Sequence, residues 1–236
     1  FAQVSYLRPH PPYAAAGEFA TWYDPADVPD PIAPVEGLHH LHQQLLAHPQ
    51  LRSPGADALR RLRAAYYGMV SEVDHQLGRL VQHLHDVGHW DDTVIVVTSD
   101  HGEQLGDHGY IQKAGFFEES HHIVGVVRDP RPTAGHGQVI DAFTENVDLL
   151  PTVCDAIGAE VPLQCDGLPL TPFLDGGAPP WWRTAAHWEF DWRTSFIGEG
   201  QPPAWPWDRH LERQHLSVRR SETTAHVQIA DGTSLT

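Results

Sequence analysis

The sequence of 236 residues contains little cysteine, little positive charge and no long apolar run. Its two cysteines, Cys154 and Cys165, are too few for a disulfide framework, which predicts a reducing, cytoplasmic compartment. Lys and Arg number 15 against 31 Asp and Glu, giving a net charge of -16. This charge argues against a nucleic-acid partner, because phosphate contacts need a basic surface. No apolar run reaches the roughly 20 residues of a membrane-spanning helix, so we expect no membrane partner.

The apolar content is 41%, enough to bury one substantial core, or one core and a small second layer. Residues 56–87 form the clearest predicted helix, because apolar residues recur there every three or four positions and make one stripe. Gly88 supplies the C-terminal stop of that helix. A strand is predicted at residues 93–99, after a short turn. This helix–strand unit favours an α/β fold.

Other elements are predicted from shorter patterns along the chain. We expect strands at residues 1–7, 122–127 and 138–143, and a helix at residues 146–157 capped by Asn146. Residues 23–34 are rich in proline and aspartate, which predicts a long surface loop. Because residues 1–7 have the pattern of a strand interior and the last residues give no stop signal, we expect a fragment at both ends.

From residue 181 the sequence changes character. Six tryptophans fall among short alternating segments, which predict a small antiparallel layer with strands at residues 185–190, 215–219 and 224–229. We therefore divide the chain into residues 1–180 and residues 181–236. The aromatic residues of the second part also predict an interface in a homo-oligomer.

The most informative feature is the junction between the strand at residues 93–99 and a polar turn. The β-branched run ahead of the turn predicts a central strand covered on both faces. Asp100 and His101 follow at its carboxyl end, where ligands bind in open α/β sheets, and Gly102 lets the backbone turn tightly behind them. A carboxylate and an imidazole suit a divalent metal. The residues alone leave a second interpretation open, an ordinary strand-end turn with a surface histidine.

Several segments of the sequence resemble one known family. Residues 98–109, TSDHGEQLGDHG, followed by Lys113, closely resemble the C-terminal signature of the sulfatases in the alkaline phosphatase superfamily. Residues 6–13 (YLRPHPPY), 145–152 (ENVDLLPT) and 165–170 (CDGLPL) resemble further landmarks of that family. Residues 187–193 (HWEFDWR) point more narrowly to its phosphonate monoester hydrolase branch. The resemblance covers nearly the whole chain, with the segments in the expected order.

The resemblance implies both a fold and a division of the chain. It implies an α/β, alkaline-phosphatase-like three-layer sandwich, present in part, with a small C-terminal antiparallel sheet subdomain. Residues 1–180 would be the C-terminal part of the catalytic domain, and residues 181–236 would begin the subdomain.

The resemblance also implies roles for four residues. Asp100 and His101 match ligands of a divalent metal, which would be calcium, manganese or magnesium. Lys113 matches the lysine that contacts the nucleophile and the charged substrate group, and His10 matches the histidine near the leaving oxygen. These roles suit a small anionic ester substrate, whose negative charge shifts to the leaving oxygen as the bond breaks. Without the motif, the residues alone favour an ordinary solvated loop for Lys113 and the end of a strand for His10.

The nucleophile of the family is absent from this sequence. The family carries a Cys/Ser-x-Pro-x-Arg motif whose first residue matures to formylglycine, and neither Cys154 nor Cys165 lies in such a motif. We therefore expect part of a metal-dependent hydrolase of phosphonate monoesters, phosphodiesters or sulfate esters, inactive as an isolated chain. A dedicated arylsulfatase and a degenerate, non-catalytic sulfatase-like domain are the alternatives.

Overall fold

The structure is a computed structural model that describes residues 1–34, 36–37, 40–113, 116–131, 135–191, 215–229 and 232–236. It divides into two compact units, Phe1–Arg131 and Pro132–Thr236. The boundary expected at residue 180, between catalytic domain and subdomain, stays a prediction. Of the tryptophans in the C-terminal segment, Trp192, Trp205 and Trp207 lie outside the described residues.

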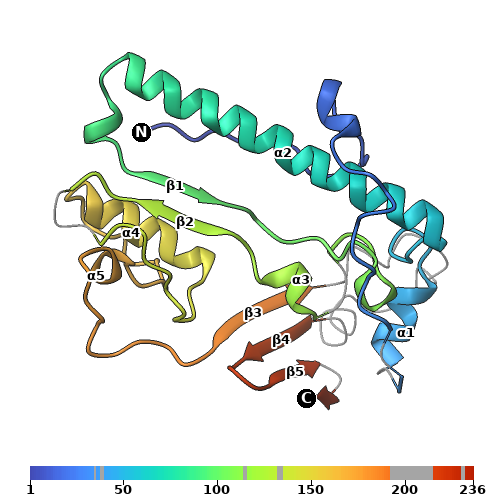
Figure 1. Cartoon of the computed structure of the whole chain (residues 1–236). Coiled ribbons are helices and arrows are strands. Elements are labelled where there is room, and N and C mark those ends of the chain that lie inside the picture. The colour runs from blue at the N-terminus through green and yellow to red at the C-terminus, as the bar shows by residue number, and fades with distance from the viewer. Residues whose placement is uncertain (35, 38–39, 114–115, 132–134, 192–214, 230–231) are drawn as a thin grey trace, which may run out of the picture. The chain divides into compact units, whose positions relative to one another are not determined.

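The long helix α2, Ala56–Asp86, dominates the first unit and confirms the helix predicted from the apolar stripe (Figure 1). It ends where expected, because Gly88 has a φ of 76°, a conformation that glycine adopts without strain. Gly68 faces the 3-10 helix η1, Gly17–Thr21, so closely that a Cβ there would lie 2.3 Å from the carbonyl oxygen of Phe19. In the described part of the chain, no helix has the length and apolar character needed to cross a membrane.

Two short strands pair antiparallel in the first unit: β1, Ile95–Thr98, and β2, Gly125–Arg128. Both strands were predicted, but the expectation of a β1 strand covered on both faces is wrong. The side chains of β1 are only half-buried, Thr98 is exposed, and Val126 of β2 is 55% exposed. Among the described residues each strand has only the other as its ladder partner.

Two other predicted strands do not form. Residues 1–7 and residues 138–143 are irregular, and Val139 is 85% exposed. An apolar alternating pattern becomes a strand only where a neighbouring strand satisfies its backbone groups, and neither segment pairs with one among the described residues. Residues 23–34 form a loop without regular structure, as predicted.

Short elements complete the first unit. They are α1, His40–Ala47; η2, Trp90–Asp92; η3, Asp107–Gly109; and α3, Glu118–His121. Leu45, Met69 and Tyr110 are large, fully buried side chains of this unit. At the far end, the Arg128 guanidinium lies 3.8 Å from the ring centre of Trp90 and so connects β2 to η2.

In the second unit, η4, Asn146–Asp148, runs into α4, Leu149–Ala156, as the predicted helix at residues 146–157 required. The predicted cap is wrong by one residue, because Glu145 rather than Asn146 occupies the N-cap and forms a capping box with Asp148. The short helix α5, Thr171–Leu174, follows. Asp148 is fully buried and accepts hydrogen bonds from Arg183, from the Leu168 amide at 2.8 Å and from the Glu145 amide at 2.8 Å.

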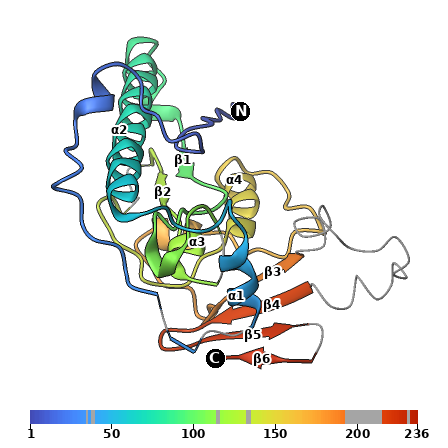
Figure 2. The ribbon, with the colours of Figure 1, turned by 90° about the vertical axis from the view of Figure 1, so that its right-hand side faces the viewer.

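A four-stranded antiparallel sheet ends the second unit, in the order β3-β4-β5-β6 (Figure 2). The strands are β3, Ala186–Asp191; β4, His215–Arg220; β5, Ala225–Ile229; and β6, Ser234–Leu235. Leu216 pairs with Ile229 and Val218 with Val227, and all four side chains are buried. Alternation in these two strands therefore places one apolar face inward. The sheet confirms the predicted antiparallel layer.

Candidate active site

Asp100 and His101 lie immediately after β1, at the start of a loop that runs from residue 99 to Lys113. The Asp100 side chain is 87% exposed and that of His101 is 27% exposed. Asp100 Oδ2 lies 3.6 Å from His101 Nε2, and the Ser99 hydroxyl donates to the His101 carbonyl oxygen at 2.8 Å. The two predicted ligands therefore converge on one point at the end of the strand.

The His101 ring is oriented by its own backbone. Its Nδ1 lies 2.8 Å from the carbonyl oxygen of Gly102, which can only accept, so Nδ1 carries the proton and Nε2 is the acceptor. A histidine that binds a metal is normally held in this way through its other ring nitrogen. The donor set and the tautomer therefore fit a divalent ion. Within the described ranges, no group of three or more His, Cys, Asp or Glu side chains could hold an ion.

Lys113 completes the cluster. It is the single lysine of the sequence, and its Nζ lies 2.7 Å from His101 Nε2, twelve residues away along the chain. The ammonium donates to the imidazole lone pair. The structure thus brings together three of the four predicted site residues.

His10 has different neighbours. It is exposed, its amide donates to the Leu7 carbonyl oxygen at 3.0 Å, and its Nδ1 lies 2.7 Å from the carbonyl oxygen of Pro11. The loop that carries it is held to α2 by Arg8, whose guanidinium lies 2.9 Å from the Glu72 carboxylate. Its proposed role beside a leaving group stays a prediction.

Glu103 links the two motifs, and the sequence reasoning did not single it out. Its carboxylate accepts from the amides of Gln112 and, at 3.3 Å, Leu105. Burial and then the Glu103 carboxylate raise the pKa of Tyr66 to about 12 and lift the pKa of Tyr13 well above its usual range. Tyr13 follows His10 by three residues and Glu103 follows His101 by two, so the segments that carry the predicted residues meet here. The only sequence signal was that Glu103 and Tyr13 both lie inside the family motifs.

The rest of the loop is held by Asp107. Its Oδ1 accepts from the Ile32 amide at 2.7 Å and lies 3.3 Å from Nη1 of the buried Arg63. Arg63 also donates to the Leu105 carbonyl oxygen at 2.8 Å. These contacts attach the loop to α2 and to the proline-rich loop.

A second support comes from α3. The His108 ring stacks on Phe117, with ring centres 3.8 Å apart, and the Gly102 amide donates to the Ser120 carbonyl oxygen at 2.8 Å. A Cβ at position 102 would lie 2.0 Å from the Glu119 carbonyl oxygen, so only glycine fits there. The backbone that presents His101 is therefore packed directly against α3.

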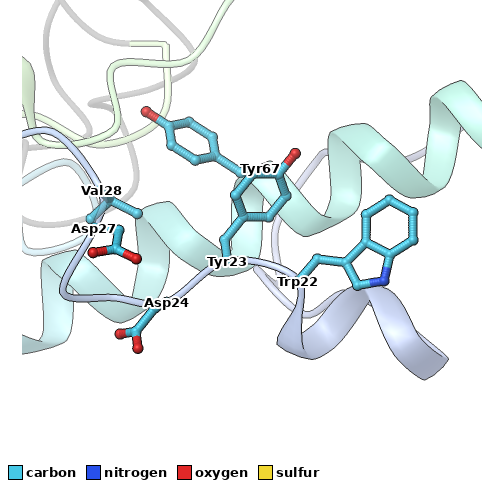
Figure 3. A pocket seen from close by; sticks show the side chains of 6 residues that line it. All are labelled: Trp22, Tyr23, Asp24, Asp27, Val28 and Tyr67. Atoms are coloured by element: carbon cyan, nitrogen blue, oxygen red, sulfur yellow. The ribbon is translucent and has the colours of Figure 1, made fainter.

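A separate hollow of about 290 Å³ lies elsewhere on the first unit. Figure 3 shows its lining, which comes from α2 and from the loop after η1: Trp22, Tyr23, Asp24, Asp27, Val28 and Tyr67. The rings of Tyr23 and Tyr67 meet edge to face, with centres 5.6 Å apart. The hollow contains none of the four predicted site residues.

Comparison with known proteins decides the family. The family model described as Sulfatase matches residues 1–159, which include all four predicted site residues. The chain belongs to the sulfatase family. Two solved relatives show the same alkaline-phosphatase-like fold over 100% of this chain and 49% of theirs. They are the phosphonate monoester hydrolase of Agrobacterium radiobacter (38% identity, TM-score 0.86) and SpPMH of Silicibacter pomeroyi (34% identity, TM-score 0.84).

Curated relatives of this sulfatase-family chain include an alkaline phosphatase superfamily protein and an arylsulfatase. The multifunctional alkaline phosphatase superfamily protein PehA of Trinickia caryophylli is 38% identical over 85% of this chain and 42% of its own length. An arylsulfatase of Clostridium perfringens is 28% identical over 77% of this chain and 38% of its own length. The chain thus spans about half the length of the relatives it matches.

Proposed function

We propose that this chain forms the metal- and lysine-bearing part of a hydrolase of phosphonate monoesters, phosphodiesters or sulfate esters. Membership of the sulfatase family supports hydrolysis of such esters. The observation that carries the proposal is the convergence of three groups: Lys113 Nζ at 2.7 Å and Asp100 Oδ2 at 3.6 Å from His101 Nε2.

In this proposal Asp100 and His101 hold a divalent ion, which stabilises negative charge on the ester oxygens when it is bound. A bound ion takes the Nε2 lone pair to which Lys113 donates, and the ammonium then attracts the same anionic group. Both positive groups are fixed before the substrate arrives, so they stabilise the developing charge without reorganising. The acidic chain as a whole would repel an anionic ester, which makes this local positive charge necessary.

His10 is proposed to give a proton to the departing alcohol or phenol oxygen. Its exposed ring on a loop tied to α2 by Arg8 leaves it accessible to a substrate. The nucleophile is proposed to come from polypeptide outside these 236 residues, because this sequence holds no Cys/Ser-x-Pro-x-Arg motif. The isolated chain is therefore expected to bind metal weakly and to turn over no ester.

Phosphonate monoesters and phosphodiesters are the proposed substrate class. The support is the similarity over the whole chain to two phosphonate monoester hydrolases, against 28% identity over 77% of the chain to an arylsulfatase. The test compares kcat/KM for an aryl phosphonate monoester and for the corresponding aryl sulfate, using the enzyme that contains this chain. A higher value for the phosphonate is expected, and a clear preference for the sulfate would establish the dedicated arylsulfatase instead.

A non-catalytic domain is the second candidate, favoured by the missing nucleophile motif. The two are separated by the sequence encoded ahead of residue 1. A Cys/Ser-x-Pro-x-Arg motif there eliminates the non-catalytic domain, and a complete gene without one eliminates the hydrolase. Metal-dependent hydrolysis by the purified 236-residue chain would contradict the expectation that its nucleophile lies elsewhere.

A further inference from the structure

We infer that Glu103 is a positioning residue that sets the place of Lys113 relative to His101, an inference that rests on the function proposed above. Glu103 lies two residues after His101, and its carboxylate accepts the amide of Gln112, the residue just before Lys113. One hydrogen bond therefore closes the loop whose two ends carry the imidazole and the ammonium.

The backbone of Gln112 shows why a clamp is needed. Its φ is 65°, in the left-handed region that a residue with a side chain adopts only at an energetic cost. Such a conformation persists only where the surroundings enforce it. Because Lys113 follows directly, the direction of its side chain depends on whether Gln112 keeps this conformation.

Three hydrogen bonds enforce it. The Gln112 amide donates to Glu103, its carbonyl oxygen accepts from the Gln104 amide at 2.9 Å, and its side chain donates to the Gln50 carbonyl oxygen at 3.1 Å. Of these, only the bond to Glu103 involves a charged acceptor, which makes it the stronger kind. Because Gly102 has no side chain, Glu103 is also the first side chain after His101.

The surroundings of Glu103 favour a hydrogen-bond acceptor at this position. Glu103 is half-buried, and after burial its charge is the next cause that raises the pKa values of Tyr13 and Tyr66. The Leu105 amide, at 3.3 Å, donates to the same oxygen, Oε1. One carboxylate oxygen therefore accepts from two backbone amides of its own loop. One of these amides belongs to Gln112, the residue before Lys113, so the bond helps to hold Lys113 in place.

The kinetic test uses the enzyme that contains this chain and compares Glu103→Ala, Glu103→Gln and the double variant Glu103→Ala/Gln112→Gly. Glu103→Ala is expected to lower kcat by about 10- to 100-fold, because moving the Lys113 ammonium by about 1 Å reduces the rate on this scale. Glu103→Gln keeps a hydrogen-bond acceptor for the Gln112 amide, so its kcat should fall less than that of Glu103→Ala. Gln112→Gly should restore most of the loss in the Ala background, since glycine adopts a positive φ without a clamp. Glu18→Ala, an exposed change on η1, is the control and should leave kcat unchanged.

A second measurement does not depend on hydrolysis. Hydrogen exchange at the Gln112 amide should be slow in the wild type, at least about tenfold faster in Glu103→Ala, and intermediate in Glu103→Gln. Unchanged exchange in Glu103→Ala, or a kcat loss that Gln112→Gly does not reduce, overturns the inference. A wild-type enzyme that hydrolyses none of the esters overturns the proposed function alone, because the exchange rates still decide the role of Glu103.

Discussion

Lys113 Nζ lies 2.7 Å from Nε2 of His101, whose other ring nitrogen is held by the Gly102 carbonyl oxygen at 2.8 Å. The single lysine of the chain is thus directed at the lone pair of an imidazole that is fixed in one tautomer. Strand β1 delivers the imidazole, and the loop that ends at residue 113 returns the ammonium to it. The relationship joins residues that the sequence keeps twelve positions apart.

Replacing Lys113 removes the fixed ammonium. In the enzyme that contains this chain, Lys113→Ala should lower kcat by about 100- to 1,000-fold, the scale of losing one preorganised electrostatic donor, about 3–4 kcal/mol of barrier. Lys113→Arg keeps the charge with a different shape and should retain part of the rate. An unchanged kcat in the alanine variant removes Lys113 from the mechanism.

Replacing either proposed ligand weakens metal binding. Asp100→Ala and His101→Ala should each reduce affinity for the divalent ion by about 100-fold or more, measured by calorimetry on the metal-stripped enzyme. The affinity should also fall as the pH is lowered, because the ligands must be deprotonated to bind. His89→Ala is the matched control, since His89 is a 64% exposed surface histidine. Full affinity in both ligand variants contradicts the assignment.

The buried ion pair of the second unit predicts a large effect on stability. Asp148 is fully buried, and Arg183 Nη2 donates to its Oδ1 at 2.7 Å, a hydrogen bond that raises the pKa of the guanidinium further. Asp148→Ala should lower the free energy of unfolding by about 3–5 kcal/mol, because it leaves the Arg183 guanidinium with the more distant Glu145 carboxylate, at 3.9 Å, as its ion-pair partner. Asp30→Ala breaks an exposed pair with Arg60 and should cost less than about 1 kcal/mol. Denaturant unfolding of both variants makes the comparison, and equal losses would contradict it.

The close approach at Gly102 predicts that even one methyl group is harmful. Gly102→Ala would place its Cβ 2.0 Å from the Glu119 carbonyl oxygen, so the backbone that carries His101 must move. We expect a loss of about 1–3 kcal/mol in stability and reduced activity. Gly78→Ala, at an exposed position of α2 with open space around it, should instead stabilise the chain by about 1 kcal/mol. Thermal unfolding of the two variants should therefore shift in opposite directions.

Stability should fall steeply at high pH. Burial and the Glu103 carboxylate raise the pKa of Tyr66 to about 12, whereas the unfolded chain releases this proton near 10. The contribution of Tyr66 is therefore complete below pH 10 and is lost as the pH rises toward 12. Denaturant unfolding between these values should show a smaller slope for Tyr66→Phe than for the wild type. Tyr13 and Tyr110, whose pKa values burial also raises, should supply the slope that remains. Equal slopes in both proteins would contradict the prediction.

The local elements of the fold were largely predictable. The helix α2, the strands β1 and β2, and the antiparallel sheet from β3 to β5 follow periodicities that lie within single segments. The predicted strands at residues 1–7 and 138–143 failed for the opposite reason. A strand needs a partner from elsewhere in the chain, and an alternating pattern does not say whether that partner is present.

The candidate site was predictable in its residue types but not in its support. Motif resemblance identified Asp100, His101 and Lys113, because chemistry fixes which side chains such a site uses. It passed over Glu103, whose carboxylate accepts from the Gln112 amide and whose charge raises the pKa of tyrosines in two other segments. Support of this kind depends on which segments fold against one another.

By itself the sequence determined the family, the α/β class and the residues that carry charge at the end of β1, since these depend on composition, periodicity and local motifs. Only the tertiary structure decided that Lys113 meets His101, that Gln112 is held at a positive φ, and that β1 is half-exposed. These outcomes depend on hydrogen bonds and packing between distant segments, which the residue pattern within one segment does not predict.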